Sequence, residues 1–289
     1  MKLYMKRFYI LFIIPFLFTC AKKQPEASWL IVEPWELIAN PDVGPNDHGA
    51  LTHNVTEAFI SMDGQLLGAF SLPAKIPVIG EGSHSFILIP GVKNNGISAT
   101  KRRYPFLQQY SASIELFKDD TVVMAPTTMY YKELTFKIED FEDATMDFEE
   151  GSGSTASLVK GDDAQYLQWG NSYGEIQLDD SNSLLSIVSE FVGSMPKQGA
   201  EVYLELDFLN TNSVLTSVIS YGNGTYHDDP YIQLNPQDNP VWKHIYIDLK
   251  EIVSTRSTSP FNEVSFNMTL DEEGTNKFVL LDNIKVIHL

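Results

Sequence analysis

Two segments in the second half of the sequence combine aromatic rings with glycine, asparagine and acidic residues. The first contains Trp169 and Tyr173, and the second contains Tyr221, Tyr226 and His227. An aromatic ring can stack on the apolar face of a sugar, while nearby amide and carboxylate groups bond its hydroxyls. Because both segments are rich in glycine and asparagine, we expect their rings on loops or strand ends, where they would form a ligand site. The same rings could instead cap a hydrophobic core, so both interpretations stay open.

One strand-like segment carries two carboxylates close together. Glu205 and Asp207 are followed by Asn210, and this order resembles the E-x-D-x-x-E strand of laminarinase-type jelly-roll hydrolases. In that family the two glutamates act as nucleophile and acid/base, and glycoside hydrolysis needs both carboxyl groups. Asn210 stands where the second glutamate would be, so the proton donor is missing. We therefore expect these carboxylates on the solvent face of an alternating strand, and glycoside hydrolysis is kept as a remote alternative.

Metal and nucleophile chemistry have little support in the sequence. The six histidines include no H-E-x-x-H segment or close pair that would suit zinc. A structural calcium is possible if Glu142, Asp147 and Asp282 converge, although acidic residues in turns are usually solvated. No G-x-S-x-G segment or glycine-rich phosphate loop is present. We predict no catalytic residues and no metal site, hence a protein that is not an enzyme and has no cofactor beyond that possible calcium.

The N-terminal residues have the composition of an export signal. Three basic residues precede an apolar run, Phe8 to Phe18, that is too short to span a bilayer. The single cysteine, Cys20, follows this run, and the segment LFTC resembles the bacterial lipobox, in which the cysteine is acylated and becomes the first mature residue. Thr19 departs from the usual Gly or Ala. We expect a signal peptide over residues 1–19, a tether over 20–27 and a lipid on Cys20 that binds the bilayer.

Residues 28–139 alternate short apolar segments with turns and predict a small all-β domain. The dipeptide Asp63-Gly64 between two apolar runs indicates a two-residue hairpin turn. Around it, Thr56–Val92 has the order I-x-x-DG-x-x-x-G-x-x-x-LP-x-x-I-P, then G-x-H-x-x-x-L-x-PG, which resembles PEGA-type surface-layer domains. The resemblance implies an immunoglobulin-like β-sandwich with a scaffolding or contact role. We expect Leu134–Ile138 to be its closing strand.

Residues 140–289 predict a second all-β domain. Val202–Leu209 alternates polar and apolar residues, as half-buried strands do. Trp242–Leu249 and Phe278–Ile287 carry the patterns W-x-x-[IV]-x-x-D-L and LDNI-x-[VI]. These patterns resemble the closing half of galactose-binding-like jelly rolls, a layout that carbohydrate-binding modules share. The resemblance implies a jelly-roll β-sandwich and leaves its ligand open, because one fold hosts many functions.

The acidic residues are concentrated in the second domain. The whole chain has a net charge of −18; residues 27–139 contain 8 basic and 12 acidic residues, whereas residues 140–289 contain 7 and 25. This balance argues against nucleic-acid binding, which needs clustered Lys and Arg. The basic cluster Lys101–Arg103 could contact lipid headgroups or an acidic partner, but a solvated turn is the simpler interpretation.

These patterns together resemble the envelope lipoproteins of Bacteroidota. We expect a non-catalytic, lipid-anchored protein whose jelly-roll domain binds a glycan or a partner surface. The alternative is a structural or assembly subunit of an outer-membrane machine, such as a secretion or gliding apparatus, with outer-membrane proteins as partners. The two lysines after Cys20 favour the periplasmic face of the outer membrane over the cell surface, although surface exposure stays open.

Overall fold

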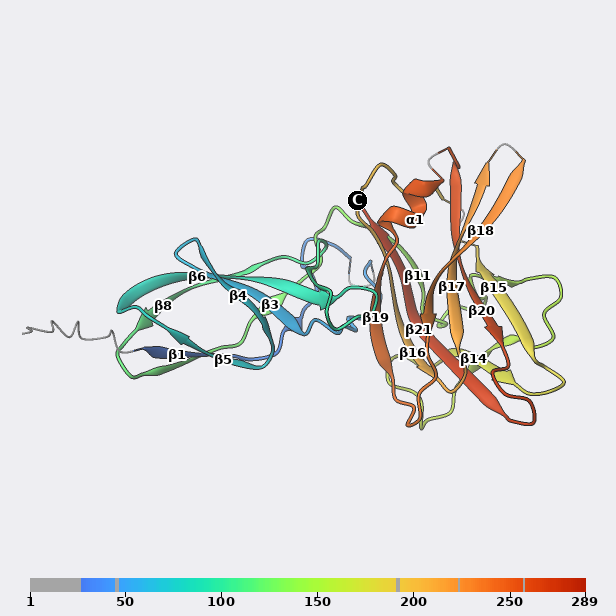
Figure 1. The fold of residues 1–289 in the computed structure, drawn as a ribbon, viewed down its shortest axis with the longest axis horizontal. Helices are drawn as coiled ribbons and strands as arrows, with labels where there is room; N and C mark the ends of the chain where they lie inside the picture. Colours follow the sequence, from blue (N-terminus) through green and yellow to red (C-terminus); the bar gives the residue numbers. More distant parts are fainter. Residues whose placement is uncertain (1–26, 45–46, 191–192, 223, 257) are drawn as a thin grey trace, which may run out of the picture.

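The computed structural model describes residues 27–289 except 45–46, 191–192, 223 and 257, and it is built almost entirely from β-strands. Two domains lie end to end (Figure 1). The first domain contains β1 (Ser28–Val32), β2 (Glu36–Leu37), β3 (Glu57–Met62), β4 (Gln65–Ser71), β5 (Ala74–Val78), β6 (Gly82–Lys93), β7 (Lys101–Arg103), β8 (Tyr110–Leu116), β9 (Thr121–Met124) and β10 (Thr127–Thr128). The expected all-β class is confirmed.

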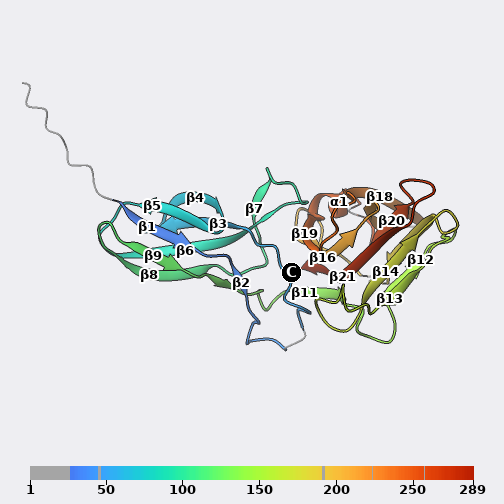
Figure 2. The ribbon, with the colours of Figure 1, turned by 90° about the horizontal axis from the view of Figure 1, so that it is seen from below.

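The first domain is a small sandwich whose strands run lengthwise toward the second domain (Figure 2). One sheet has the order β5-β1-β9, and the facing sheet has the order β4-β3-β6-β7, with β8 also paired to β6. Asp63 and Gly64 connect β3 to β4 with positive φ angles of 50° and 80°, which is the backbone of the expected hairpin turn. Alternate apolar residues such as Leu30, Ile60 and Phe86 are fully buried between the sheets.

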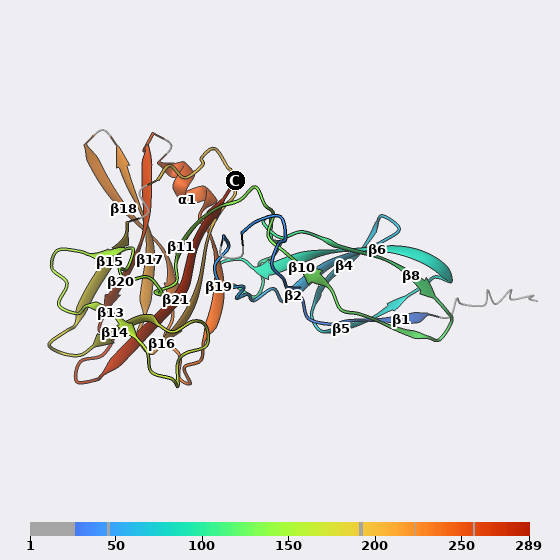
Figure 3. The same cartoon turned by 180° about the vertical axis from the view of Figure 1, so that it is seen from behind.

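The second domain is a larger two-sheet sandwich, seen from behind in Figure 3. Its sheets have the orders β13-β14-β21-β16-β19 and β12-β15-β20-β17-β18, all antiparallel. Its elements are β11 (Thr135–Glu139), β12 (Phe148–Glu150), β13 (Leu158–Gly161), β14 (Tyr173–Leu178), β15 (Leu184–Ser189), β16 (Val202–Asn210), β17 (Val214–Gly222), β18 (Thr225–Leu234), β19 (Lys243–Asp248), α1 (Lys250–Thr255), β20 (Phe261–Thr269) and β21 (Lys277–His288). Apolar residues from both sheets fill the space between them.

The strand β11 corrects the expected domain division. We expected this segment to close the first domain, but Thr135 pairs with His288 and Glu139 pairs with Ile284, so β11 adds to β21 of the second domain. Phe136 of this strand packs against the cluster shared by the two domains, so β11 pairs with the second domain while it still contacts the first. Among the described residues, no helix is long and apolar enough to cross a membrane.

The two domains share one hydrophobic cluster. Tyr203, Tyr246 and Ile287 on the second domain are buried in the same cluster as Tyr104 and Phe106 of the first. The ring centroids of Tyr104 lie 5.0 Å from Tyr203 and 4.8 Å from Tyr246. Aromatic pairs at these separations add to the burial energy. The sheet face formed by β16, β19 and β21 is therefore covered by the first domain.

Candidate functional site

We expected the polar face of β16 to be exposed to solvent, but it is buried. Glu205 is 0% exposed and Asp207 is 1% exposed. The alternation does place Leu204, Leu206 and Phe208 in the sandwich core. It also places Glu205 and Asp207 on the opposite face, but that face is the one that the first domain covers. The expectation was wrong because a period of two distinguishes the faces of a strand without showing what lies on either of them.

A hydrogen-bonded network satisfies these buried carboxylates. Glu205 accepts from the hydroxyl of Tyr104 and, at 2.7 Å, from that of Tyr130, both from the first domain. Asp207 lies 2.9 Å from Nδ1 of His244 and accepts from the side-chain amide of Asn283 at 3.1 Å. Such partners are what make buried charges tolerable.

Two basic groups balance the two carboxylates. Burial alone would lower the pKa of His244, but its hydrogen bond with Asp207 and its ion pair with Glu205 at 3.5 Å outweigh burial and raise that pKa. Burial likewise opposes ionisation of Glu205, yet the nearby His244 and Lys285 bring its pKa below the usual value. Lys285 is 0% exposed, and its ammonium donates to the carbonyl of Ala50. The network therefore fastens the loop before β3 to the second domain.

The basic cluster of β7 also binds within the chain. Arg102 donates to both carboxylate oxygens of Glu201 at 2.7 and 2.9 Å, and it forms an ion pair with Asp248. Lys101 forms an ion pair with the buried Glu57 at 2.7 Å. The solvated-turn interpretation is corrected for these two residues, because Arg102 connects the first domain to carboxylates of the second.

A groove lies beside this interface, where β19 forms the edge of its sheet. The loop after β6 reaches that edge: the backbone N–H of Asn95 donates to the carbonyl of Tyr246 at 2.8 Å, and the side-chain oxygen of Asn95 accepts from the N–H of Asp248 at 2.8 Å. This contact covers part of an otherwise unpaired strand edge. The groove has a volume of about 830 Å³ and is lined by residues of both domains.

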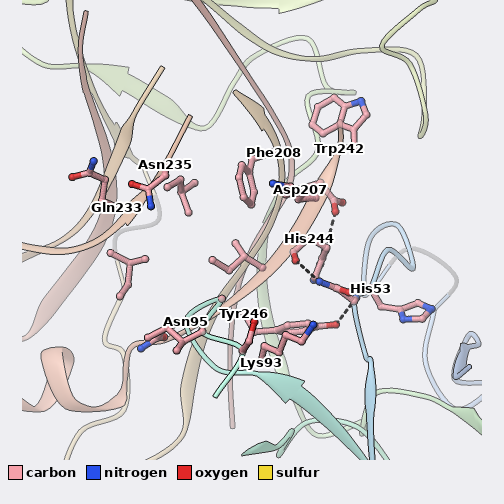
Figure 4. A pocket seen from close by; sticks show the side chains of 18 of the residues that line it. His53, Lys93, Asn95, Asp207, Phe208, Gln233, Asn235, Trp242, His244 and Tyr246 are labelled. Atoms are coloured by element: carbon pink, nitrogen blue, oxygen red, sulfur yellow. Dashed lines mark hydrogen bonds and ion pairs between the residues drawn. The ribbon is translucent and has the colours of Figure 1, made fainter. Parts of the chain in front are cut away.

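The groove presents aromatic rings and amides together. Figure 4 shows the rings of Trp242 and Phe208 and the amides of Asn95, Gln233 and Asn235, all of which line the groove. Trp242 is half-buried, and its indole N–H donates to the carbonyl of Tyr166 at 2.8 Å, which fixes the ring. Trp169 also lines the groove, with its ring centroid 5.8 Å from that of Trp242.

Two groove amides are free to bond a ligand. Within the ranges that the structure describes, the side chains of Gln168 and Asn235 make no hydrogen bond, and both residues are exposed. His53 lines the opposite wall, where burial and the charge of His244 lower its pKa. A neutral imidazole can both donate and accept. The groove thus combines fixed rings with uncommitted polar groups, the chemistry used to hold a sugar.

The predicted binding residues fall into separate places. Trp169 lines the groove, whereas Tyr173 is 1% exposed and packs in a small cluster with Leu209 and Leu280. The core-cap interpretation therefore holds for Tyr173. Its ring lies 6.2 Å from that of Trp242 and so supports the groove wall from behind.

The second predicted segment lies elsewhere. Tyr221 and Tyr226 pair with ring centroids 5.4 Å apart and line a separate pocket of about 340 Å³ with Glu263. His227 lies on β18, where it pairs with Ser220 of β17, and it lines neither pocket. The structure does not bring Tyr226 and Trp169 together into one groove, as joint binding of one ligand would require.

Two of the three possible calcium ligands have other partners, Glu142 and Asp282, and Asp282 accepts from the backbone N–H of Asn283 at 2.7 Å; Asp147 is exposed. Glu142 accepts hydrogen bonds from the backbone of Asn171 at 2.6 Å and of Ser172 at 3.0 Å, so it orders the loop beside Trp169. Asp282 is 3% exposed, and burial and the charge of Asp207 raise its pKa to about 8. In the described part of the chain, no group of three or more His, Cys, Asp or Glu side chains is placed to hold a metal ion. Cys20 lies outside the described residues.

Sequence reasoning missed most of the groove. His53, Asn95 and Asn235 come from three segments far apart in the sequence, and Trp242 was noted only as the first residue of a strand pattern. The asparagine-rich composition of 94–95 and of 235–239 was the available signal, but it does not show that these loops meet. Their approach depends on the docking of the domains.

Comparison with known proteins gives likeness in fold alone. No family model and no curated protein matches the chain. Among solved structures, a carbohydrate-binding module of the β-sandwich superfamily has 14% identity and a TM-score of 0.38, with 80% of this chain and 84% of that chain covered. A family 11 carbohydrate-binding module from Clostridium thermocellum has 17% identity and a TM-score of 0.34, with 53% of this chain and 95% of that chain covered.

A catalytic protein is also among these structures. The enzymatically active domain of tailspike protein 4 of bacteriophage CBA120 has 12% identity and a TM-score of 0.38, with 52% of this chain covered. This chain spans only 20% of the length of that tailspike chain.

Proposed function

We propose that this protein binds a glycan, without cleaving it, in the groove between its two domains. The observation that supports this proposal most directly is the position of Trp169, whose half-buried ring lines the groove near the free amides of Gln168 and Asn235. A ring held by its neighbours loses little conformational freedom on binding, and adjacent amides select among hydroxyl arrangements.

The state of the carboxylates supports binding without hydrolysis. Glycoside hydrolysis needs a pair of carboxyl groups that reach the scissile bond. Glu205 is fully buried under Tyr104 and Tyr130, and Asp207 is held by His244 and Asn283. Asn210, in the place of a second glutamate, donates to the backbone carbonyl of Asn212 at 2.7 Å.

We also propose that the protein acts in the bacterial cell envelope. The lipobox-like segment that ends at Cys20 supports acylation of that thiol, and a lipobox cysteine carries enough chains for stable anchoring. In this proposal the first domain is a scaffold, and the groove is held away from the periplasmic face of the outer membrane. Mass spectrometry of the native membrane-extracted protein tests it, and an unmodified N-terminal sulfur would overturn it.

Glycan binding is tested with the mature chain on a glycan array, followed by calorimetry on the best ligand. Trp169→Ala should weaken binding at least tenfold, because it removes the stacking surface. Tyr226→Ala is the matched control, since that ring is 54% exposed but lies outside the groove, and it should change the affinity less than twofold. Loss of binding with the Tyr226 variant and not with the Trp169 variant would show that the binding site lies outside the groove.

A further inference from the structure

The charge of the groove differs in sign from the charge of the protein. The chain has a net charge of −18, and residues 140–289 contain 25 acidic but only 7 basic residues. The groove nevertheless has Lys93 on the wall from the first domain and Lys243 on the wall from the second. Lys93 is the last residue of β6, and Lys243 is the first residue of β19.

Neither lysine is neutralised by the protein. Several other basic residues do have carboxylate partners, such as Arg256 with Asp229 at 2.7 Å and Lys250 with Glu201 at 3.3 Å. Among the residues that the structure describes, no ion pair or hydrogen bond involves the ammonium group of Lys93 or Lys243.

The remaining titratable groups of the groove leave these two charges uncompensated. Asp207 is its one acidic residue, and that carboxylate is already engaged by His244 and Asn283. Burial lowers the pKa of His53, so its ring is neutral at neutral pH. The hydroxyl of Tyr231 donates to the backbone carbonyl of Asp248 at 2.9 Å, and burial raises the pKa of Tyr231 and of Tyr246.

We propose that the groove takes an anionic glycan, one that carries carboxylate or sulfate groups, with Lys93 and Lys243 as the residues that bind the charged substituents. This inference rests on the proposed glycan-binding function and specifies its ligand class. Lysine contributes a compact charge on a flexible stem and imposes no bidentate geometry. A carboxylate and a sulfate are therefore both compatible with the site.

The acidity of the rest of the protein does not oppose this assignment at close range. At about 0.15 M ionic strength, charges in solvent are screened over about 8 Å. Acidic groups farther away than this act only weakly on a bound ligand, whereas the two lysines line the groove itself. The general negative charge instead slows the approach of an anionic polymer, an effect on the association rate.

Calorimetry at about 0.15 M salt with three oligosaccharides of equal length tests the inference: an oligogalacturonate, its methyl ester and a sulfated galactan. The inference predicts that one or both anionic chains bind at least tenfold more tightly than the neutral ester. The galacturonate and sulfate arms identify which anion the site prefers. The double variant K93Q/K243Q should lose that preference, while its affinity for the ester stays within twofold.

The matched control is K132Q/K137Q, which removes the same charge from two exposed lysines that do not line the groove. It should leave the preference intact, and an equal loss there would assign the effect to net charge and overturn the inference. Equal binding of all three chains that is abolished by Trp169→Ala would overturn the inference while upholding glycan binding. Binding of none of these chains, nor of any glycan on the array, would overturn the proposed function itself.

Discussion

The hydroxyl of Tyr130 donates a 2.7 Å hydrogen bond to Oε2 of Glu205, across the boundary between the two domains. Both groups are almost completely buried, with 1% of Tyr130 and 0% of Glu205 exposed. Tyr104 bonds the other oxygen of the same carboxylate. The first domain thus supplies both hydroxyls that bond a charged group of the second. If the domains separated, the carboxylate of Glu205 would lose both donors and would be hydrated by water instead.

Removal of the Tyr130 hydroxyl should destabilise the domain pair. Tyr130→Phe leaves one carboxylate oxygen of Glu205 buried without its donor, and hydrogen bonds to charged groups contribute about 1.5–3 kcal/mol. We expect a loss of that size in the free energy of unfolding by urea. Tyr131→Phe is the control, because Tyr131 is 39% exposed, and it should cost less than about 0.5 kcal/mol. Equal stability of the two variants would contradict the role assigned to Tyr130.

The ion pair between Arg102 and Glu201 should contribute modestly, since both side chains are about 30% exposed and screened by solvent. A double-mutant cycle with R102Q and E201Q should give a coupling energy of about 0.5–1 kcal/mol. Higher salt should reduce it. A coupling energy near zero at low salt would show that the pair is not formed in solution.

Replacement of Asp282 should stabilise the protein at alkaline pH. Burial and the charge of Asp207 raise the pKa of Asp282 to about 8, from an ordinary value of 3.8. Because this pKa is higher in the folded state, the stability that the protonated group contributes is complete below pH 3.8 and is lost as the pH rises through 8. At pH 8.5, the free energy of unfolding of Asp282→Asn should therefore be at least about 1.4 kcal/mol greater than that of the parent protein. Asp238→Asn, at an exposed site, should show no such gain, and a less stable Asp282 variant at that pH would refute the assignment.

The two histidines near the groove should titrate on opposite sides of pH 6.5. The hydrogen bond of His244 with Asp207 and its ion pair with Glu205 outweigh its burial and raise its pKa, whereas burial lowers the pKa of His53. The stability that His244 provides is consequently complete below pH 6.5 and declines as the pH rises through its folded-state pKa.

Nuclear magnetic resonance of the histidine side chains measures both titrations directly, with His53→Gln and His244→Gln used for assignment. The midpoint of His244 should lie above 6.5 and that of His53 below 6.5. The reverse order would mean that the carboxylates beside His244 do not outweigh its desolvation.

The sequence was informative for features that depend only on residues close together in the chain. The dipeptide Asp63-Gly64 predicted a hairpin because positive φ angles at both positions favour those residues. The apolar positions of β16 identified the face that enters the sandwich core. These features depend on neighbours in the sequence and can be read without knowledge of the fold.

The interface and the groove depend on distant segments and could not be read in this way. Phe136 indicates a strand, but the partner of β11 is β21, at the end of the chain. Glu205 has the same local pattern whether solvent or Tyr104 covers it. Trp169 was singled out by composition, whereas His53 and Asn95 join it only because the domains dock.

The hydrophobic cluster that extends from one domain into the other has a mechanical consequence. Flexion between the domains would require the rings of Tyr104 and Tyr203 to separate and would expose Glu205 to water. The two domains should therefore behave as one rigid body under tension. A force applied to a ligand in the groove would be transmitted to β1, at the far end of the first domain (Figure 1), without bending at the domain boundary.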